Sequence, residues 1–215
     1  MGKQINIRDW LLERFVDGRP KVFIEIGAND GSDTQWMSDI PGVTVHAFEP
    51  DPRLSPVTKP NVFWRQVAIG NQTGMTTFHP SAVWDDPPWT ESGSIPWTES
   101  GSIYEPTGHL QRYPGVKFGE PFHVSITTLD IYCHDAGIEK IDFIWADLQG
   151  AEGDMILGGQ EVLPNTRFLY TEYSNNPLYQ EQVDLHTLIG MLPGSWRIVE
   201  LWPDDVLLEN VSFID

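Results

Sequence analysis

The sequence predicts an α/β fold in which helices cover both faces of a mostly parallel sheet. Short β-rich apolar segments alternate with helical patterns along most of the 215 residues, as expected for parallel strands joined by helical crossovers. The last two predicted strands are separated only by residues 202–205, which is too short for a crossover, so they should be antiparallel. We expect residues 1–215 to form a single domain, with a Pro/Trp-rich insertion at about 80–120.

The first half begins with an amphipathic helix, because Ile7, Trp10, Leu11 and Phe15 fall on one face. Apolar β-rich runs then predict strands at 22–26, 43–48 and 62–69, with a short helix at 32–38. Residues 75–78 follow a Gly-containing turn and resemble the return strand of a hairpin with the third strand.

The second half continues the alternation of strands and helices. Strands are predicted at 122–127, 141–146, 167–173, 196–201 and 206–213, and helices at 128–136, 152–163 and 178–192. The spacing of Leu185, Leu188, Ile189 and Leu192 supports the last helix.

Residues 80–120 interrupt this alternation with six prolines, three tryptophans and no regular period. The octapeptide at 88–95, Pro-Trp-Thr-Glu-Ser-Gly-Ser-Ile, is repeated without change at 96–103. Two copies are too few for a solenoid, so the repeat is either a duplication tolerated in a surface loop or part of a lid or acceptor-binding insertion over an active site. Five aromatic residues of the insertion could stack on sugar rings or simply pack together: Trp84, Trp89, Trp97, Tyr104 and Tyr113.

The composition excludes several classes of partner. Thirteen Lys and Arg against 31 Asp and Glu give a net charge of −18, which argues against nucleic acid and anionic membranes. The single cysteine, Cys133, cannot form an internal disulfide, and no Cys/His spacing suggests zinc. Because no apolar run suits a membrane span or a secretory signal, we expect a cytoplasmic protein. The oligomeric state is not predicted.

The glycine-rich turn after the first strand, Glu25-Ile-Gly-Ala-Asn-Asp-Gly-Ser32, carries the strongest functional signal. Such a turn lets backbone approach a ligand beside a helix N-terminus. Glu49, 22 residues beyond Gly27, ends the second strand, where a carboxylate can accept both hydroxyls of a ribose. Together these features predict a nucleoside-binding half-sheet.

The charges around this turn favour one class of cofactor. Glu25, Asp30 and Asp33 would repel a pyrophosphate, and the dinucleotide fingerprint G-x-G-x-x-G is absent. They suit the sulfonium and ammonium groups of S-adenosylmethionine. Two other hypotheses stay open: an NAD-dependent or nucleotide-sugar oxidoreductase, and a non-catalytic binding module.

Five motifs in order resemble the FkbM family of S-adenosylmethionine-dependent methyltransferases: IEIGANDGS, HAFEP, VAIGNQTGMTTF, the run from SITTLD to AEGDMI, and LYTEY. The resemblance implies a Rossmann-like seven-stranded methyltransferase sheet with its last strand antiparallel, and O-methylation of a saccharide or similar polar acceptor. It also implies cofactor contacts from Glu25, Gly27, Ala28, Asn29, Asp30, Gly31, Glu49, Pro50, Gln66, Val67, Ala68 and Asp147.

The segment Trp145-Ala-Asp147-Leu-Gln149-Gly150 departs from the family pattern, because Trp145 and Gln149 replace a common lysine and glutamate. The resemblance therefore says little about which acceptor is used.

Asp147 follows a predicted strand at the edge where α/β sheets bind ligands. It could act as general base or orient the acceptor, contact the methionine amine, or cap a helix that begins at Gly150. Glu172 and Tyr173 end the next strand and could reach the same pocket.

An ordinary aspartate is a weak base for a sugar hydroxyl. It would need burial, a like-charged neighbour such as Glu172, or a divalent metal, although no ligand spacing indicates a metal. The other candidate bases are His109, His123 and His134.

Overall fold

The computed structural model describes residues 5–85 and 94–214. A seven-stranded sheet has the order β12-β13-β11-β10-β1-β2-β3. Its strands are β1 (Lys21–Ile26), β2 (Val43–Phe48), β3 (Val62–Arg65), β10 (Ile141–Ala146), β11 (Thr166–Glu172), β12 (Trp196–Leu201) and β13 (Asp205–Asn210). Neighbours from β11 to β3 are parallel, whereas β13 is antiparallel to both β11 and β12. The predicted α/β class, the seven strands and the antiparallel last strand are confirmed.

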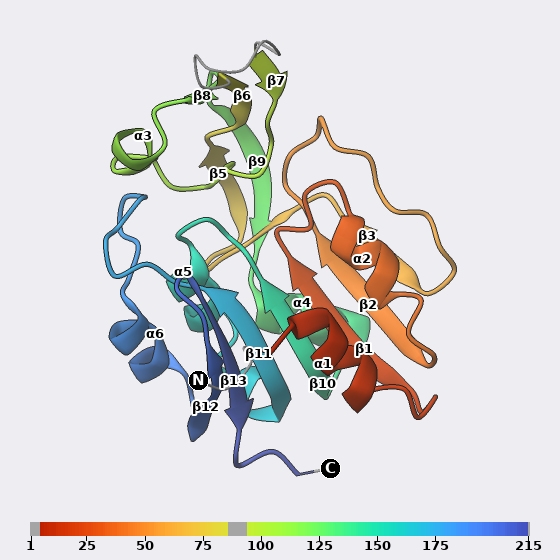
Figure 1. The fold of residues 1–215 in the computed structure, drawn as a ribbon. Helices are drawn as coiled ribbons and strands as arrows, with labels where there is room; N and C mark the ends of the chain where they lie inside the picture. Colours follow the sequence, from red (N-terminus) through yellow and green to blue (C-terminus); the bar gives the residue numbers. More distant parts are fainter. Residues whose placement is uncertain (1–4, 86–93, 215) are drawn as a thin grey trace.

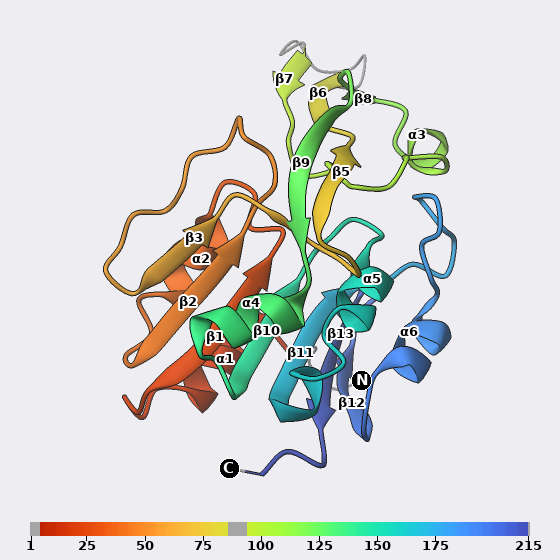
Figure 2. The same ribbon diagram turned by 180° about the vertical axis from the view of Figure 1, so that it is seen from behind.

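Helices cover both faces of this sheet (Figures 1 and 2). One face carries α1 (Ile7–Arg14) and α2 (Ser32–Met37), and the other carries α4 (Leu129–Ala136), α5 (Glu152–Leu157) and α6 (Leu185–Met191). The helix starts follow capping rules, since the side chains of Asn6, Thr128 and Asp184 accept backbone N–H bonds at α1, α4 and α6.

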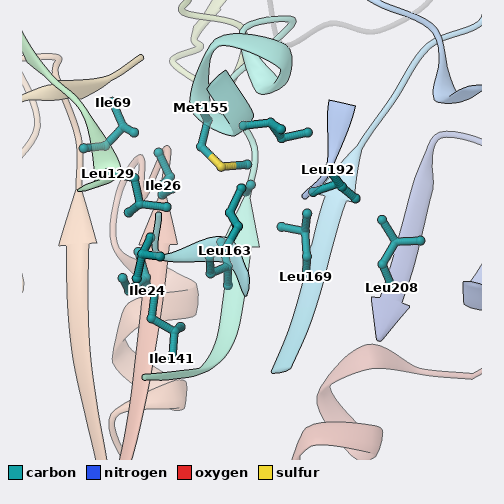
Figure 3. Close-up of a cluster of buried hydrophobic side chains, with 14 of the residues drawn as sticks. Ile24, Ile26, Ile69, Leu129, Ile141, Met155, Leu163, Leu169, Leu192 and Leu208 are labelled. Carbon is teal, nitrogen blue, oxygen red and sulfur yellow. The ribbon is translucent and has the colours of Figure 1, made fainter. Parts of the chain in front are cut away.

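Each face of the sheet has its own apolar core. Leu11 of α1 and Phe15, which follows this helix, pack with Phe23, Phe143 and Phe168 of the sheet. The opposite core joins the sheet to α4, α5 and α6, and Figure 3 shows ten of its residues with labels, among them Ile24, Leu129, Met155 and Leu192. Because β1 and β10 are buried from both sides, the backbone at their carboxyl ends is held rigidly.

Residues 62–69 do not form one strand. β3 ends at Arg65, and β4 (Ala68–Ile69) leaves the main sheet to pair with β9 (Phe122–Thr127). The predicted hairpin of residues 75–78 with the third strand is wrong, because β5 (Gly74–Phe78) also pairs with β9. The partner strand lies some 50 residues further along the chain, so the local pattern could not reveal it.

Two predicted helices are shorter than expected. The helix predicted at 152–163 ends at Leu157, where Gly158 and Gly159 follow and Gly158 packs against the Gly70 carbonyl; a 3₁₀ turn, Leu163–Asn165, comes later. The helix predicted from 178 begins only after its cap at Asp184.

The insertion lies beyond the carboxyl ends of the parallel strands (Figures 1 and 2). It holds β6 (Ser81–Asp85), β7 (Ser94–Pro96), β8 (Val116–Phe118) and the short helix α3 (His109–Arg112), with the strand order β7-β6-β8. Residues 88–93 of the first octapeptide lie outside the described residues. In the part of the chain described, no helix is long and apolar enough to cross a membrane.

Candidate active site

A cavity of about 350 Å³ opens at the carboxyl ends of β1, β2 and β10, and we call it the first cavity. Its wall includes ten of the predicted cofactor residues: Glu25, Gly27, Ala28, Asn29, Asp30, Glu49, Pro50, Val67, Ala68 and Asp147. Gly31 and Gln66 are not in this wall. Gly31 packs against Val57 and Trp64, and the Gln66 side chain lies 3.4 Å from the Asp51 carbonyl.

Two buried glutamates face the first cavity. Glu25 accepts a hydrogen bond from the Thr34 hydroxyl. Glu49 accepts the backbone N–H groups of Asn29 (2.8 Å) and Asp51 (2.7 Å). Among the described residues, neither glutamate forms an ion pair with Lys or Arg, so both keep acceptor capacity for a ligand.

The turn after β1 lies directly against the loop that carries Asp147. Gly27 has φ +86°, and a Cβ atom at this position would lie 1.8 Å from the Asp147 carbonyl oxygen. The Asp147 N–H donates to the Ile26 carbonyl at 2.9 Å. This contact fixes the spacing between the glycine turn and Asp147, and it requires glycine at position 27.

The first cavity favours a cation. Among the described residues, six with carboxylates and none of the Lys, Arg or His residues line it. Burial raises the pKa of Glu25 to about 8 and that of Glu49 to about 7, with nearby carboxylates adding to both shifts. A cationic ligand would relieve this repulsion, whereas a pyrophosphate would increase it.

These raised pKa values predict how the stability of the ligand-free protein depends on pH. Glu25, Glu49 and Glu152 (pKa about 7) each bind a proton more tightly when folded than when unfolded. The stability that these three groups give to the folded protein is fully present below about pH 4, and it is lost as the pH rises through their folded pKa values. The buried His46, whose pKa is lowered to about 4, acts in the opposite direction only below about pH 6.5.

Between pH 6.5 and 8.5 we therefore expect the free energy of unfolding to fall by about 2–4 kcal/mol, as measured by urea unfolding. A Glu25→Gln variant should show a shallower fall, because it removes the group with the highest of the three pKa values. A free energy that rises over this range in the wild type would contradict the burial of these acids.

A second cavity of about 280 Å³ adjoins the first. Asp147, Gln149 and Glu99 line both cavities, while Glu172 and Tyr173 line only the second. The structure thus brings the three predicted catalytic residues to the second cavity, and Asp147 lies where this cavity meets the first.

The predicted stacking residues are divided. Trp97 and Tyr113 are in the wall of the second cavity, whereas Tyr104 interacts with Asp154. The side chains of Trp84 and Trp89 lie outside the described part.

Asp147 and Glu172 form a close carboxylate pair at this junction. Burial raises the pKa of both groups, and the Asp147 charge further raises that of Glu172. Such a pair holds one proton more readily than none, which leaves the other carboxylate as a stronger base than an ordinary aspartate. Among the described residues, no group of three or more His, Cys, Asp or Glu side chains is arranged to hold a metal ion.

The interpretation of Asp147 as a helix cap is wrong. The helix α5 begins at Glu152 rather than near Gly150. The carboxylate of Glu152 itself accepts the free N–H groups of Leu148 (3.0 Å) and Gly150 (3.2 Å). Asp147 is therefore free of that role.

Only one of the three candidate histidines reaches the site. His109 is 3% exposed, lines the second cavity, and has no hydrogen-bond partner for Nδ1. Burial and the nearby Arg112 lower its pKa, so its imidazole is neutral at pH 7. His123 and His134 are exposed and lie outside both cavity walls.

The second octapeptide forms the wall between the cavities. The Thr98 hydroxyl donates to Asn29 Oδ1 (2.8 Å), and the Ser102 hydroxyl donates to the Gln149 carbonyl (2.8 Å). The Ser100 carbonyl lies 3.0 Å from the Tyr179 hydroxyl. These bonds tie the insertion to the glycine turn and to the Asp147 loop.

Sequence reasoning missed Gln149, Tyr179 and Glu152 as site residues. Gln149 was noted only as a departure from the family pattern, although it contacts both Asp147 and Glu172. Tyr179 lies in a segment predicted to be helical, where its side chain could not be placed.

The comparisons with known proteins agree with this geometry. Residues 25–197 match the family described as the methyltransferase FkbM domain. The chain is 40% identical over 205 residues to 2-O-methyltransferase NoeI of Sinorhizobium fredii (strain NBRC 101917 / NGR234), an alignment that covers 89% of this chain and 80% of that protein. These two matches support an enzyme. They give no support to the hypothesis of an oxidoreductase or to that of a non-catalytic binding module. The chain is a methyltransferase that belongs to the FkbM methyltransferase domain family.

Proposed function

We propose that the protein is an O-methyltransferase that binds S-adenosylmethionine in the first cavity and methylates a saccharide hydroxyl held in the second. The observation that carries the proposal is the position of Asp147, which lines both cavities. The similar protein is named as a 2-O-methyltransferase, which supports oxygen as the atom that accepts the methyl group.

The residues of the first cavity fit the methyl donor, which supplies a methyl group on a cationic sulfur. Glu25 and the backbone from Gly27 to Asp30 would surround the methionine part, and Glu49 would accept the ribose hydroxyls. Val67 and Ala68 would pack beside the adenine. The excess of carboxylates over cations in this wall suits the positive charges of the donor.

The residues of the second cavity fit a sugar. Trp97 and Tyr113 offer flat apolar faces, and Arg112 and Gln182 offer hydrogen-bond donors around them. In the reaction the acceptor oxygen forms a bond to the methyl carbon as the carbon–sulfur bond breaks. Asp147 takes the hydroxyl proton, and the two cavities hold the reacting atoms in line.

Calorimetric titration with S-adenosylhomocysteine, with NAD in a parallel cell, tests the cofactor assignment. We expect micromolar binding of S-adenosylhomocysteine alone, and a loss of about 10-fold or more in affinity in Glu49→Ala, because a site built for ribose hydroxyls loses its acceptor. Glu209→Ala, in β13 and outside both cavity walls, is the control and should bind normally. NAD binding, or equal affinities in wild type and Glu49→Ala, would refute the assignment.

The acceptor class is tested by incubation with donor labelled in its methyl group. A panel of oligosaccharides and methyl glycosides should yield a labelled product whose methyl ether survives mild base. Label transferred only to carboxylates or amines would contradict O-methylation of sugars.

A further inference from the structure

The side chain of Gln149, in the loop that carries Asp147, forms a hydrogen bond with each of two carboxylates. Its amide nitrogen donates one hydrogen to Asp147 Oδ1 (2.7 Å) and the other to Glu172 Oε2 (2.9 Å). Both of its donors are thus used on the two carboxylates of the candidate base. Its backbone has φ +52°, a conformation that non-glycine residues rarely adopt.

The surroundings hold this amide in one orientation. The Tyr179 hydroxyl lies 2.8 Å from Gln149 Oε1, and the Ser102 hydroxyl donates to the Gln149 carbonyl. Gly150 packs so closely against Tyr179 that a Cβ atom at position 150 would lie 2.8 Å from the Tyr179 Cβ and 3.1 Å from its ring. A flipped amide would set its oxygen against two carboxylates, so the carboxylates themselves select the observed orientation.

We propose that Gln149 is a positioning residue for methyl transfer: its amide holds Asp147 and Glu172 together as a pair that shares one proton, with Asp147 left ionised toward the acceptor. The inference rests on the proposed function, because it takes Asp147 as the base. Glutamine can bridge the pair because it supplies two donors without adding a charge, whereas a glutamate there would add a third carboxylate.

Electrostatics support this division of the proton. Gln149 donates to both carboxylates, so the two groups differ in the hydrogen bond between them: it opposes the burial that raises the pKa of Asp147, whereas for Glu172 this bond, burial and the Asp147 charge all raise the pKa. The proton therefore resides on Glu172. The other groups that act on the pair through their charge or titration are Glu25, Glu49, Glu152, Asp205, Tyr170 and Tyr179. Across the second cavity lie Glu99, His109, Arg112 and Asp204.

The test follows the protonated carboxyl of the pair by infrared difference spectroscopy of the ligand-free protein between pH 5 and 9. The band that disappears in Glu172→Gln reports the pair. We expect Gln149→Glu to raise its titration midpoint by about one pH unit or more, since it replaces a donor with a like charge. Gln149→Leu, which removes only the donor, should give a smaller rise.

The matched control is Gln160→Glu, an exposed glutamine outside both cavity walls, which should leave the midpoint unchanged. The acid limb of the pH profile of kcat/KM, which reports protonation of Asp147, should shift in the same direction as the midpoint. If a Gln149 variant does not fold, Tyr179→Phe supplies the same test. It removes the hydroxyl that holds the Gln149 amide in place, so the titration midpoint should rise by a smaller amount.

An unmoved midpoint in folded Gln149 variants, or a lower one, would overturn the inference. A raised midpoint together with full turnover in Asp147→Asn would be a different result. It would leave Gln149 as the bridge of the pair and refute Asp147 as the base.

Discussion

The Asp147→Asn variant is expected to bind S-adenosylhomocysteine with near wild-type affinity and to lose methyl transfer by about 10²–10⁴-fold in kcat. The side chain keeps its size and its place beside Gln149, but it can no longer accept the hydroxyl proton. The measurement pairs calorimetry with turnover of the saccharide found in the labelled-methyl screen. Retained binding with lost turnover separates the base from a contact with the methionine amine, which would cost both.

Two further variants test whether the loss of turnover is specific to Asp147. Glu172→Gln should cost less than Asp147→Asn, because its neutral amide resembles the protonated glutamate. Asp135→Asn, with a side chain 74% exposed on the outside of the molecule, should behave as wild type. Full turnover in Asp147→Asn would remove this aspartate from the chemistry.

Gly27→Ala is expected to destabilise the protein by about 4 kcal/mol or more and to abolish binding of S-adenosylhomocysteine. The added methyl carbon would lie 1.8 Å from the Asp147 carbonyl, so β1 and β10 would have to separate at their buried ends. Urea unfolding measures the stability, and calorimetry measures the binding.

Gly18→Ala provides the matched control. Its φ is +70°, close to the +86° of Gly27, but nothing lies within 4 Å of the position of its Cβ. Gly18→Ala should therefore lower the free energy of unfolding by only about 1 kcal/mol, because it introduces backbone strain without a steric clash. Equal costs for the two substitutions would show that the contact between Gly27 and Asp147 is unimportant.

The main sheet could be predicted because its signals are local. The strand predictions at 43–48, 141–146 and 196–201 agree with the structure to the residue, since each is a short apolar run between polar or turn residues. The four residues after Leu201 were enough to show that the last two strands are antiparallel. Glu25, Glu49 and Asp147 could be placed at one edge because parallel strands end on the same side.

The rest depended on contacts between distant parts of the chain. Nothing near Ala68 indicates that it pairs with Ile126, and nothing near Tyr179 indicates that its hydroxyl approaches Gln149. The second octapeptide was recognised as a repeat, but its place between two cavities depends on how the insertion folds over the sheet. Secondary-structure patterns cannot supply such information, because it resides in tertiary packing.

The contact between Gly27 and Asp147 also bears on how the enzyme could evolve. In the proposed function, the donor site and the base lie at the carboxyl ends of β1, β2 and β10, whereas Trp97, Arg112 and Tyr113 belong to the insertion. Acceptor preference can therefore drift through substitutions in the insertion while the chemistry stays intact. A natural or engineered lineage with this sheet can reach new sugars by exchange of residues 97–113, provided that Thr98 and Ser102 keep their bonds to Asn29 and to the Asp147 loop.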